Sequence, residues 1–212
     1  GEAYLQFAEP INLNDFLKEY PMNENISEKD WLFRVTPILG KRIMNNINEA
    51  TVVTSTALFS MALLNSDGFS ISKKELISRI ELIKSLLKED KYSSKILICD
   101  KSGEEILNQM KKLGFLPQEE INDRISLSNQ EAAKLSFYRN NISHLLIFES
   151  LICGFFQYQK EILKEDLIES LKMIYPFLKE EFFLKWEESE LEQLNDSKIK
   201  KLMEKGLILD DT

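Results

Sequence analysis

The residues of this chain that could do chemistry gather in one run, Tyr138-Arg-Asn-Asn-Ile-Ser-His144, which holds the only histidine among the 212 residues. An imidazole can serve as a general base, and a guanidinium can bind a phosphate group. Apolar residues follow at 145–148, and an unpaired polar atom in an apolar interior costs about 1 to 3 kcal/mol. The candidate site residues are Arg139, Asn140, Asn141 and His144. We therefore expect each of them to have a specific partner.

Two of these residues also have structural interpretations. A lone histidine on an apolar helix is more often a satisfied core residue than a ligand or a base. Arg139 is charged at any relevant pH, and a buried arginine is almost always paired. The residues favour a core role for His144. They favour a structural clamp to an acidic side chain for Arg139, and contact with a substrate or cofactor phosphate is the alternative.

The elements around this run are predicted to be mainly α, forming a multi-helix domain with a few short β-strands. Ser128-Asn-Gln-Glu131 opens a helix that is expected to continue through His144 into Phe148. Further helices are predicted from Pro37 in a first turn, over 52–64, over 72–88 with capping-box spacing, over 103–113, over 162–186 with a kink or break at Pro176, and over 188–205. Strands are predicted over 3–8, 95–99, 123–127 and 207–209.

Composition excludes several classes of protein. The chain has 43% hydrophobic and 29% charged residues and a formal net charge of −8, which disfavours a general surface for nucleic acid or anionic membrane. Cys99 and Cys153 lack the spacing of a disulfide framework or a zinc site, so they are expected to be buried free thiols. We expect no metal, no cofactor and no transmembrane helix.

Four blocks of the sequence then resemble one family, the bacterial membrane-associated glycerol-3-phosphate acyltransferases. The run at 138–144 and the segment Ile174-Tyr-Pro-Phe-Leu-Lys-Glu-Glu-Phe-Phe-Leu-Lys-Trp186 are similar to its C-terminal part. The stretch at 43–58 resembles the segment just after its catalytic domain. Tyr4-Leu-Gln-Phe-Ala-Glu-Pro10 resembles the end of that domain, where the family usually has Gly in place of Ala8.

The resemblance implies that catalysis in the family uses a His-x-x-x-x-Asp pair, which this sequence lacks. His144 and Glu149 have the spacing of such a pair with Glu in place of Asp. We interpret this spacing as a coincidence, because the intervening residues look like the continuation of an apolar helix. No residue here is therefore assigned a catalytic role. The sequence is expected to be a truncated piece, with Gly1 as a tag remnant.

The resemblance also implies a domain division and a function. Residues 1–20 would end the acyltransferase catalytic domain, 21–30 would be a linker, and 31–212 would form a C-terminal helical domain. This domain would support acyl transfer from acyl-CoA or acyl carrier protein to glycerol 3-phosphate in phospholipid synthesis. Its partners would be the upstream catalytic domain and, peripherally, the cytoplasmic face of the inner membrane. The fragment alone would be soluble and inactive, and would bind no nucleic acid.

Two features of the C-terminal third have alternative interpretations. Seven aromatic residues could line an acyl-chain groove, although aromatic residues at helical spacing usually pack in a core: Phe155, Phe156, Tyr175, Phe177, Phe182, Phe183 and Trp186. The lysines at 198, 200, 201 and 205 are expected to form a solvated face, with membrane or carrier docking as the alternative. A basic helix that runs into a strand at 207–209 would instead suggest a winged-helix-like binding module without catalysis.

Overall fold

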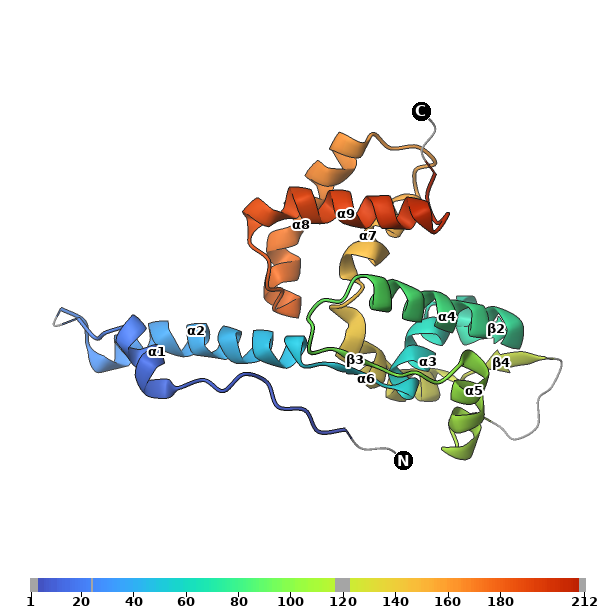
Figure 1. Cartoon of the computed structure of the whole chain (residues 1–212), viewed down its shortest axis with the longest axis horizontal. Coiled ribbons are helices and arrows are strands. Elements are labelled where there is room, and N and C mark those ends of the chain that lie inside the picture. Colours follow the sequence, from blue (N-terminus) through green and yellow to red (C-terminus); the bar gives the residue numbers. More distant parts are fainter. Residues whose placement is uncertain (1–3, 24, 117–122, 210–212) are drawn as a thin grey trace. The chain divides into compact units, whose positions relative to one another are not determined.

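The computed structural model describes residues 4–23, 25–116 and 123–209, which are mainly helical (Figure 1). The chain divides into two compact units, Gly1–Leu145 and Leu146–Thr212, and each is described by itself. The prediction of a mainly α fold with a few short strands is confirmed for the described residues.

The first unit is built around α3 (Ser55–Leu64), whose residues are all buried except Thr56. The helix is apolar on nearly every side, so neighbours must cover it all round. Three helices pack against it: α4 (Lys73–Glu89), α5 (Gly103–Lys112) and α6 (Asn129–Ser143). Thr54 caps α3, since its Oγ1 accepts from the backbone N–H of Ala57 at 3.2 Å. The predicted helix over 52–64 is therefore correct from residue 55 onward.

Short strands join the segments between these helices. The two residues before the cap, Val52 and Val53, form β1 (Val52–Val53), which pairs in parallel with β3 (Leu97–Ile98). The antiparallel pair is β2 (Ser70–Ser72) with β4 (Arg124–Ser126), in a register that places Ile71 opposite Ile125. The strands predicted over 95–99 and 123–127 are thus confirmed in shorter form.

Two other predicted strands are absent from the described residues. Tyr4–Ala8 forms no strand, although the segment is tied to the unit through Gln6, whose Nε2 donates to the Lys95 carbonyl at 2.5 Å. Residues 207–209 form no strand either, because the chain only bends after Gly206 (φ 66°) ends the last helix.

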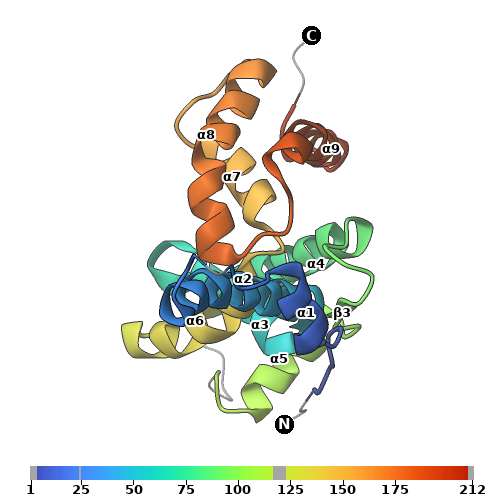
Figure 2. The same cartoon turned by 90° about the vertical axis from the view of Figure 1, so that its left-hand side faces the viewer.

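The helices α1 (Leu13–Glu19) and α2 (Glu28–Glu49) lie side by side (Figures 1 and 2). Trp31 Nε1 donates to the Tyr20 carbonyl at 2.9 Å. The prediction that Pro37 begins a helix is wrong. Ser27 caps α2, since its Oγ accepts from the N–H of Asp30 at 3.2 Å, and proline inside a helix removes only one backbone donor. The linker predicted over 21–30 is therefore helical from residue 28 onward.

The second unit consists of α7 (Ile147–Phe155), α8 (Lys164–Phe182) and α9 (Leu191–Glu204), with a short 3-10 turn before α9. Tyr175 on α8 is fully buried and stacks on Phe148 with ring centroids 5.9 Å apart. Its hydroxyl donates to the Trp186 carbonyl at 2.6 Å.

Pro176 lies inside α8, and the helix continues past it to Phe182. Of the two predicted outcomes at this proline, a kink or an interruption, the interruption is therefore wrong. The predicted extension to residue 186 is wrong as well, because Phe183 adopts a left-handed conformation (φ 50°) and ends the helix.

Candidate functional site

The helix that carries the predicted site is interrupted at its end. α6 begins as predicted, with a capping box in which Ser128 and Glu131 bond each other's backbone N–H. It stops at Ser143, however, and α7 begins only at Ile147. Leu146, with φ −125° and ψ 12°, lies outside the helical region. The prediction of one continuous helix through residue 148 is therefore wrong.

His144 lies at this break and is only 5% exposed. Its Nε2 atom is 3.3 Å from the carbonyl oxygen of Asn48 and 3.4 Å from Thr51 Oγ1. The ring meets Tyr92 edge-on at 5.3 Å between centroids. Burial lowers the pKa of His144 to about 4, although the bond to the Asn48 carbonyl opposes this shift. The imidazole is therefore neutral at pH 7, with its Nε2 proton donated to Asn48, and the contacts fit the core interpretation.

Arg139 and Asn140 bond each other on a more open side of α6. The Nε and Nη2 atoms of Arg139 donate to Asn140 Oδ1 at 3.2 and 3.1 Å. Arg139 is only half-buried, and no carboxylate of a described residue forms an ion pair with it. The expected clamp between Arg139 and an acidic side chain is therefore absent from the part of the chain that the structure describes. Because the guanidinium is not buried, it needs no carboxylate to compensate its charge.

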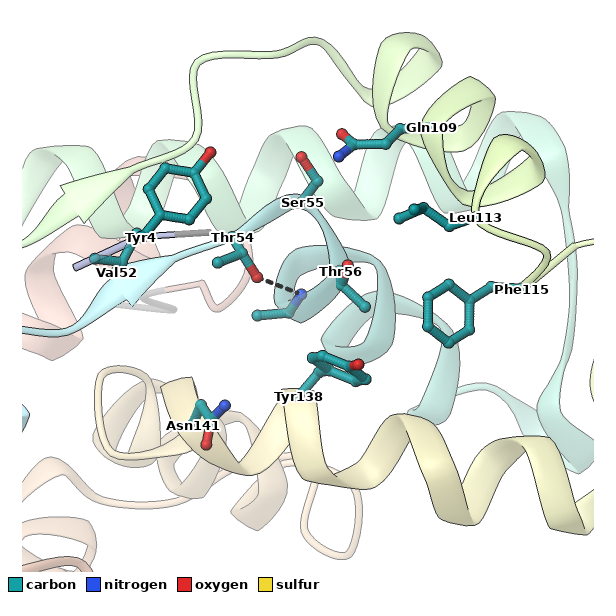
Figure 3. A pocket seen from close by; sticks show the side chains of 11 residues that line it. Tyr4, Val52, Thr54, Ser55, Thr56, Gln109, Leu113, Phe115, Tyr138 and Asn141 are labelled. Carbon is teal, nitrogen blue, oxygen red and sulfur yellow. Dashed lines mark hydrogen bonds between the residues drawn. The ribbon is translucent and has the colours of Figure 1, made fainter. Parts of the chain in front are cut away.

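Asn141 faces a pocket of about 480 Å³ within the first unit (Figure 3). The pocket lies where the first turn of α3 meets the end of α5 and the last turns of α6. Its walls comprise Tyr4, Val52, Thr54, Ser55, Thr56, Ala57, Gln109, Leu113, Phe115, Tyr138 and Asn141. Of the four predicted site residues, only Asn141 belongs to this wall. Residues 138 and 141 are one helical turn apart, and this spacing in the sequence already indicates that Tyr138 lies beside Asn141.

The chemistry of this pocket is that of binding rather than of proton transfer. Among the described residues, its wall contains no carboxylate, imidazole or amine, so these residues supply no general base near neutral pH. It does supply hydroxyl and amide groups beside aromatic rings, and Phe115 meets Tyr138 edge-on at 5.9 Å. Among the residues that the structure describes, no three potential metal ligands lie together.

A second polar cluster, in the other unit, was missed by the sequence reasoning. Glu149 on α7 and Lys198 on α9 are 8% and 4% exposed, and Lys198 Nζ lies 2.5 Å from Glu149 Oε1. Lys198 therefore does not belong to the solvated basic face that the sequence suggested. The second oxygen of Glu149 and the amide of the fully buried Asn195 have no hydrogen-bond partner among the described residues.

The signal for this ion pair was a single charged residue inside an apolar run, 145–152. A buried carboxylate requires a cation or several donors, so a partner lysine was to be expected. The pair also affects its surroundings, because burial, and then the charge of Glu149, raise the pKa of the Cys153 thiol. Both cysteines are free and partly buried.

The structure removes the basis of two alternative interpretations. The side chains of His144 and Glu149 each have their own partner, Asn48 and Lys198, so the near-match to a catalytic pair carries no catalytic geometry. The winged-helix interpretation loses its basis, since Lys198 is buried and residues 207–209 form no strand. Of the seven aromatic residues, Tyr175 is buried and Phe177 is 77% exposed.

The described residues form a helical module whose histidine is buried and bonded to a backbone carbonyl, and whose pocket beside Asn141 is lined by uncharged side chains. Residues 1–212 match the protein family described as the glycerol-3-phosphate acyltransferase C-terminal region, and the chain belongs to that family.

Curated relatives agree with this assignment. Glycerol-3-phosphate acyltransferase of Pseudomonas paraeruginosa is 27% identical over 216 residues, which cover 98% of this chain and 26% of the relative. The enzyme of Actinobacillus pleuropneumoniae is 30% identical over 200 residues, covering 90% of this chain and 24% of the relative. The chain thus spans about a quarter of the length of these relatives.

Proposed function

We propose that this chain supports, and does not itself perform, the acylation of glycerol 3-phosphate at its first hydroxyl in a glycerol-3-phosphate 1-O-acyltransferase. The acyl donor is acyl-CoA or acyl carrier protein, and the base belongs to a catalytic domain that precedes these residues. The observation that carries this proposal is the state of His144. Its Nε2 donates to the Asn48 carbonyl, and burial lowers its pKa to about 4, so the imidazole is a weak base held inside the fold.

The test is complementation in two pieces. The preceding segment of a full-length relative is expressed with and without this chain, and transfer of labelled acyl groups to glycerol 3-phosphate is measured. We expect activity only when both pieces are present, and none from the purified chain. Acyl transfer by the purified chain alone would show that the base lies within it, and His144→Gln would then identify whether the imidazole is that base.

Arg139 and Asn140 are kept as substrate-proximal candidates in this proposal. Their side chains bond only each other among the described residues, so Arg139 can turn toward a phosphate without breaking a structural link. In the complemented enzyme, we expect Arg139→Ala to raise KM for glycerol 3-phosphate and to leave kcat unchanged. Arg124→Ala is the matched control, because among the described residues Arg124 bonds only Ser70. An unchanged KM would exclude Arg139 from the substrate site.

The location of the enzyme follows from the same proposal. No helix in the described residues is long and apolar enough to cross a bilayer. We place the full enzyme at the cytoplasmic face of the inner membrane, with this region making at most peripheral contact. Cosedimentation with anionic and neutral vesicles tests this contact, and only binding that salt removes fits a peripheral surface.

A further inference from the structure

The pocket beside Asn141 has the composition of an interface core. None of the described residues that line it carries a formal charge, and interface cores are depleted in charged residues and enriched in aromatic ones. Three of its lining side chains are apolar or aromatic and half-exposed: Tyr4, Leu113 and Tyr138. Tyrosine side chains, which combine a large apolar ring with one polar group, are typical of binding hot spots.

Polar groups on two walls of this pocket are available to a partner. The Thr56 hydroxyl on α3, and the Tyr138 hydroxyl and Asn141 amide on α6, form no hydrogen bond with any described residue. Figure 3 shows the side chains of Thr56 and Tyr138 on facing sides of the pocket. A pocket with a few such groups gives an occupant both apolar contact and orientation.

We propose that this pocket is the docking site for the catalytic domain that precedes these residues in the same protein, and that it receives an uncharged, aromatic or amide-bearing part of that domain. The inference rests on the proposed function, which supplies the preceding domain. Tyr4 forms part of the wall, and each earlier residue extends the chain by about 3.5 Å at most. A domain that precedes Tyr4 is therefore tethered to this pocket through the chain, so docking there costs little extra loop entropy.

The lining also argues against a substrate as the occupant. Glycerol 3-phosphate and coenzyme A both carry phosphate groups, which proteins usually bind through Arg or Lys. Lys101 contacts one described residue of the wall, because its Nζ donates to Gln109 Oε1 at 3.0 Å, and this bond engages its ammonium group. An uncharged protein surface suits these walls better than a phosphate does.

Thiol labelling of the full-length enzyme tests the docking without relying on activity. Single cysteines are introduced as Asn141→Cys and Leu113→Cys, on two different walls, in a background in which Cys99 and Cys153 are alanine. The control is Phe137→Cys, which lies on the same helix as Asn141, is 77% exposed and does not line the pocket. Maleimide labelling rates are compared between the full-length enzyme and this chain, and circular dichroism confirms that each variant is folded.

We expect both pocket cysteines to react about tenfold or more slowly in the full-length enzyme, because interface cores exclude solvent, and the control cysteine to react at a similar rate in both. Equal rates at the two pocket positions would overturn the docking. Slower labelling in this chain after addition of coenzyme A or glycerol 3-phosphate would also overturn it, since the pocket would then bind a small molecule. Acyl transfer, measured on the same samples, separates the two proposals. An active enzyme with unprotected pocket cysteines would retain the proposed function and contradict the docking. An inactive enzyme with protected pocket cysteines would retain the docking and contradict the proposed function.

Discussion

The Nε2 atom of His144 lies 3.3 Å from the carbonyl oxygen of Asn48, a residue 96 positions earlier in the chain. This bond connects the end of α6 to the last turn of α2, where the helix leaves carbonyl groups without intrahelical partners. A side chain whose type suggests catalysis therefore holds two distant segments of the first unit together.

Replacing His144 tests this structural role. We expect His144→Ala to lower the free energy of unfolding by about 2 to 4 kcal/mol, because the change opens a cavity and removes the hydrogen bond from the imidazole to the Asn48 carbonyl. His144→Gln should lower the free energy of unfolding by less, since the Nε2 atom of the glutamine can donate to the same carbonyl. Urea denaturation followed by circular dichroism measures both variants. Equal losses for Ala and Gln would show that the hydrogen bond contributes nothing.

The stability of the chain should also depend on pH through His144. The folded imidazole stays neutral down to about pH 4, whereas the unfolded one takes a proton below its ordinary pKa of 6.5. Between these values the unfolded state binds more protons, so stability falls as the pH is lowered. The loss from this residue reaches about 3 kcal/mol at pH 4. Urea midpoints across this range should therefore change less steeply in His144→Gln than in the unaltered chain, and identical slopes would refute the assignment.

The buried pair of Glu149 and Lys198 makes a different prediction. We expect Lys198→Met to destabilise the second unit by about 3 to 5 kcal/mol, because it leaves a buried carboxylate unpaired. The double variant with Glu149→Leu should recover most of this loss. Lys200→Met is the control, with an expected effect below about 0.5 kcal/mol, since its amine lies 4.0 Å from Glu204 on the surface.

The fluorescence of Trp186 isolates this measurement when Trp31 is replaced by Phe. Trp186 belongs to the second unit and packs edge-on against Phe148, with ring centroids 5.5 Å apart. A double variant as unstable as Lys198→Met would mean that the loss comes from the lysine stem rather than from the unpaired charge.

The capping box of α6 allows a matched comparison between two serines on one helix. Ser128 Oγ accepts from the N–H of Glu131 at 3.3 Å, and Ser128→Ala should cost about 1 kcal/mol. Ser136 lies in the interior of the helix, where its hydroxyl bonds the Ala133 carbonyl, so Ser136→Ala should be neutral or slightly stabilising. The midpoints of thermal unfolding of the two variants are compared, and equal midpoints would show that α6 does not depend on its cap.

Local signals in the sequence predicted much of this fold. Ser128 with Glu131, and Ser72 with its following residues, marked helix starts correctly, and Gly114 marked a helix end (φ 75°). Pro37 and Pro176 misled the prediction because a proline inside a packed helix is tolerated when tertiary contacts compensate one missing bond.

The candidate site was less predictable, because its arrangement depends on contacts between distant segments. The break after Ser143 exists where His144 is buried against Asn48, and nothing within residues 138–148 indicates that contact. The pocket beside Asn141 likewise requires α3, α5 and the N-terminal segment to meet. The family resemblance pointed to the run at 138–144 as a whole. Only the folded chain shows that Asn141 lines the pocket and that His144 does not.

The burial of α3 has a consequence for how the chain is made. Its apolar surface is covered in part by α6, which leaves the ribosome well after α3 does. At about 5 to 20 residues per second, the nascent chain carries an uncovered apolar helix for several seconds. Contacts of this sequence separation slow folding and expose the chain to aggregation. A chaperone that binds apolar helices during synthesis is therefore expected to engage residues 55–64 before any other segment of the first unit.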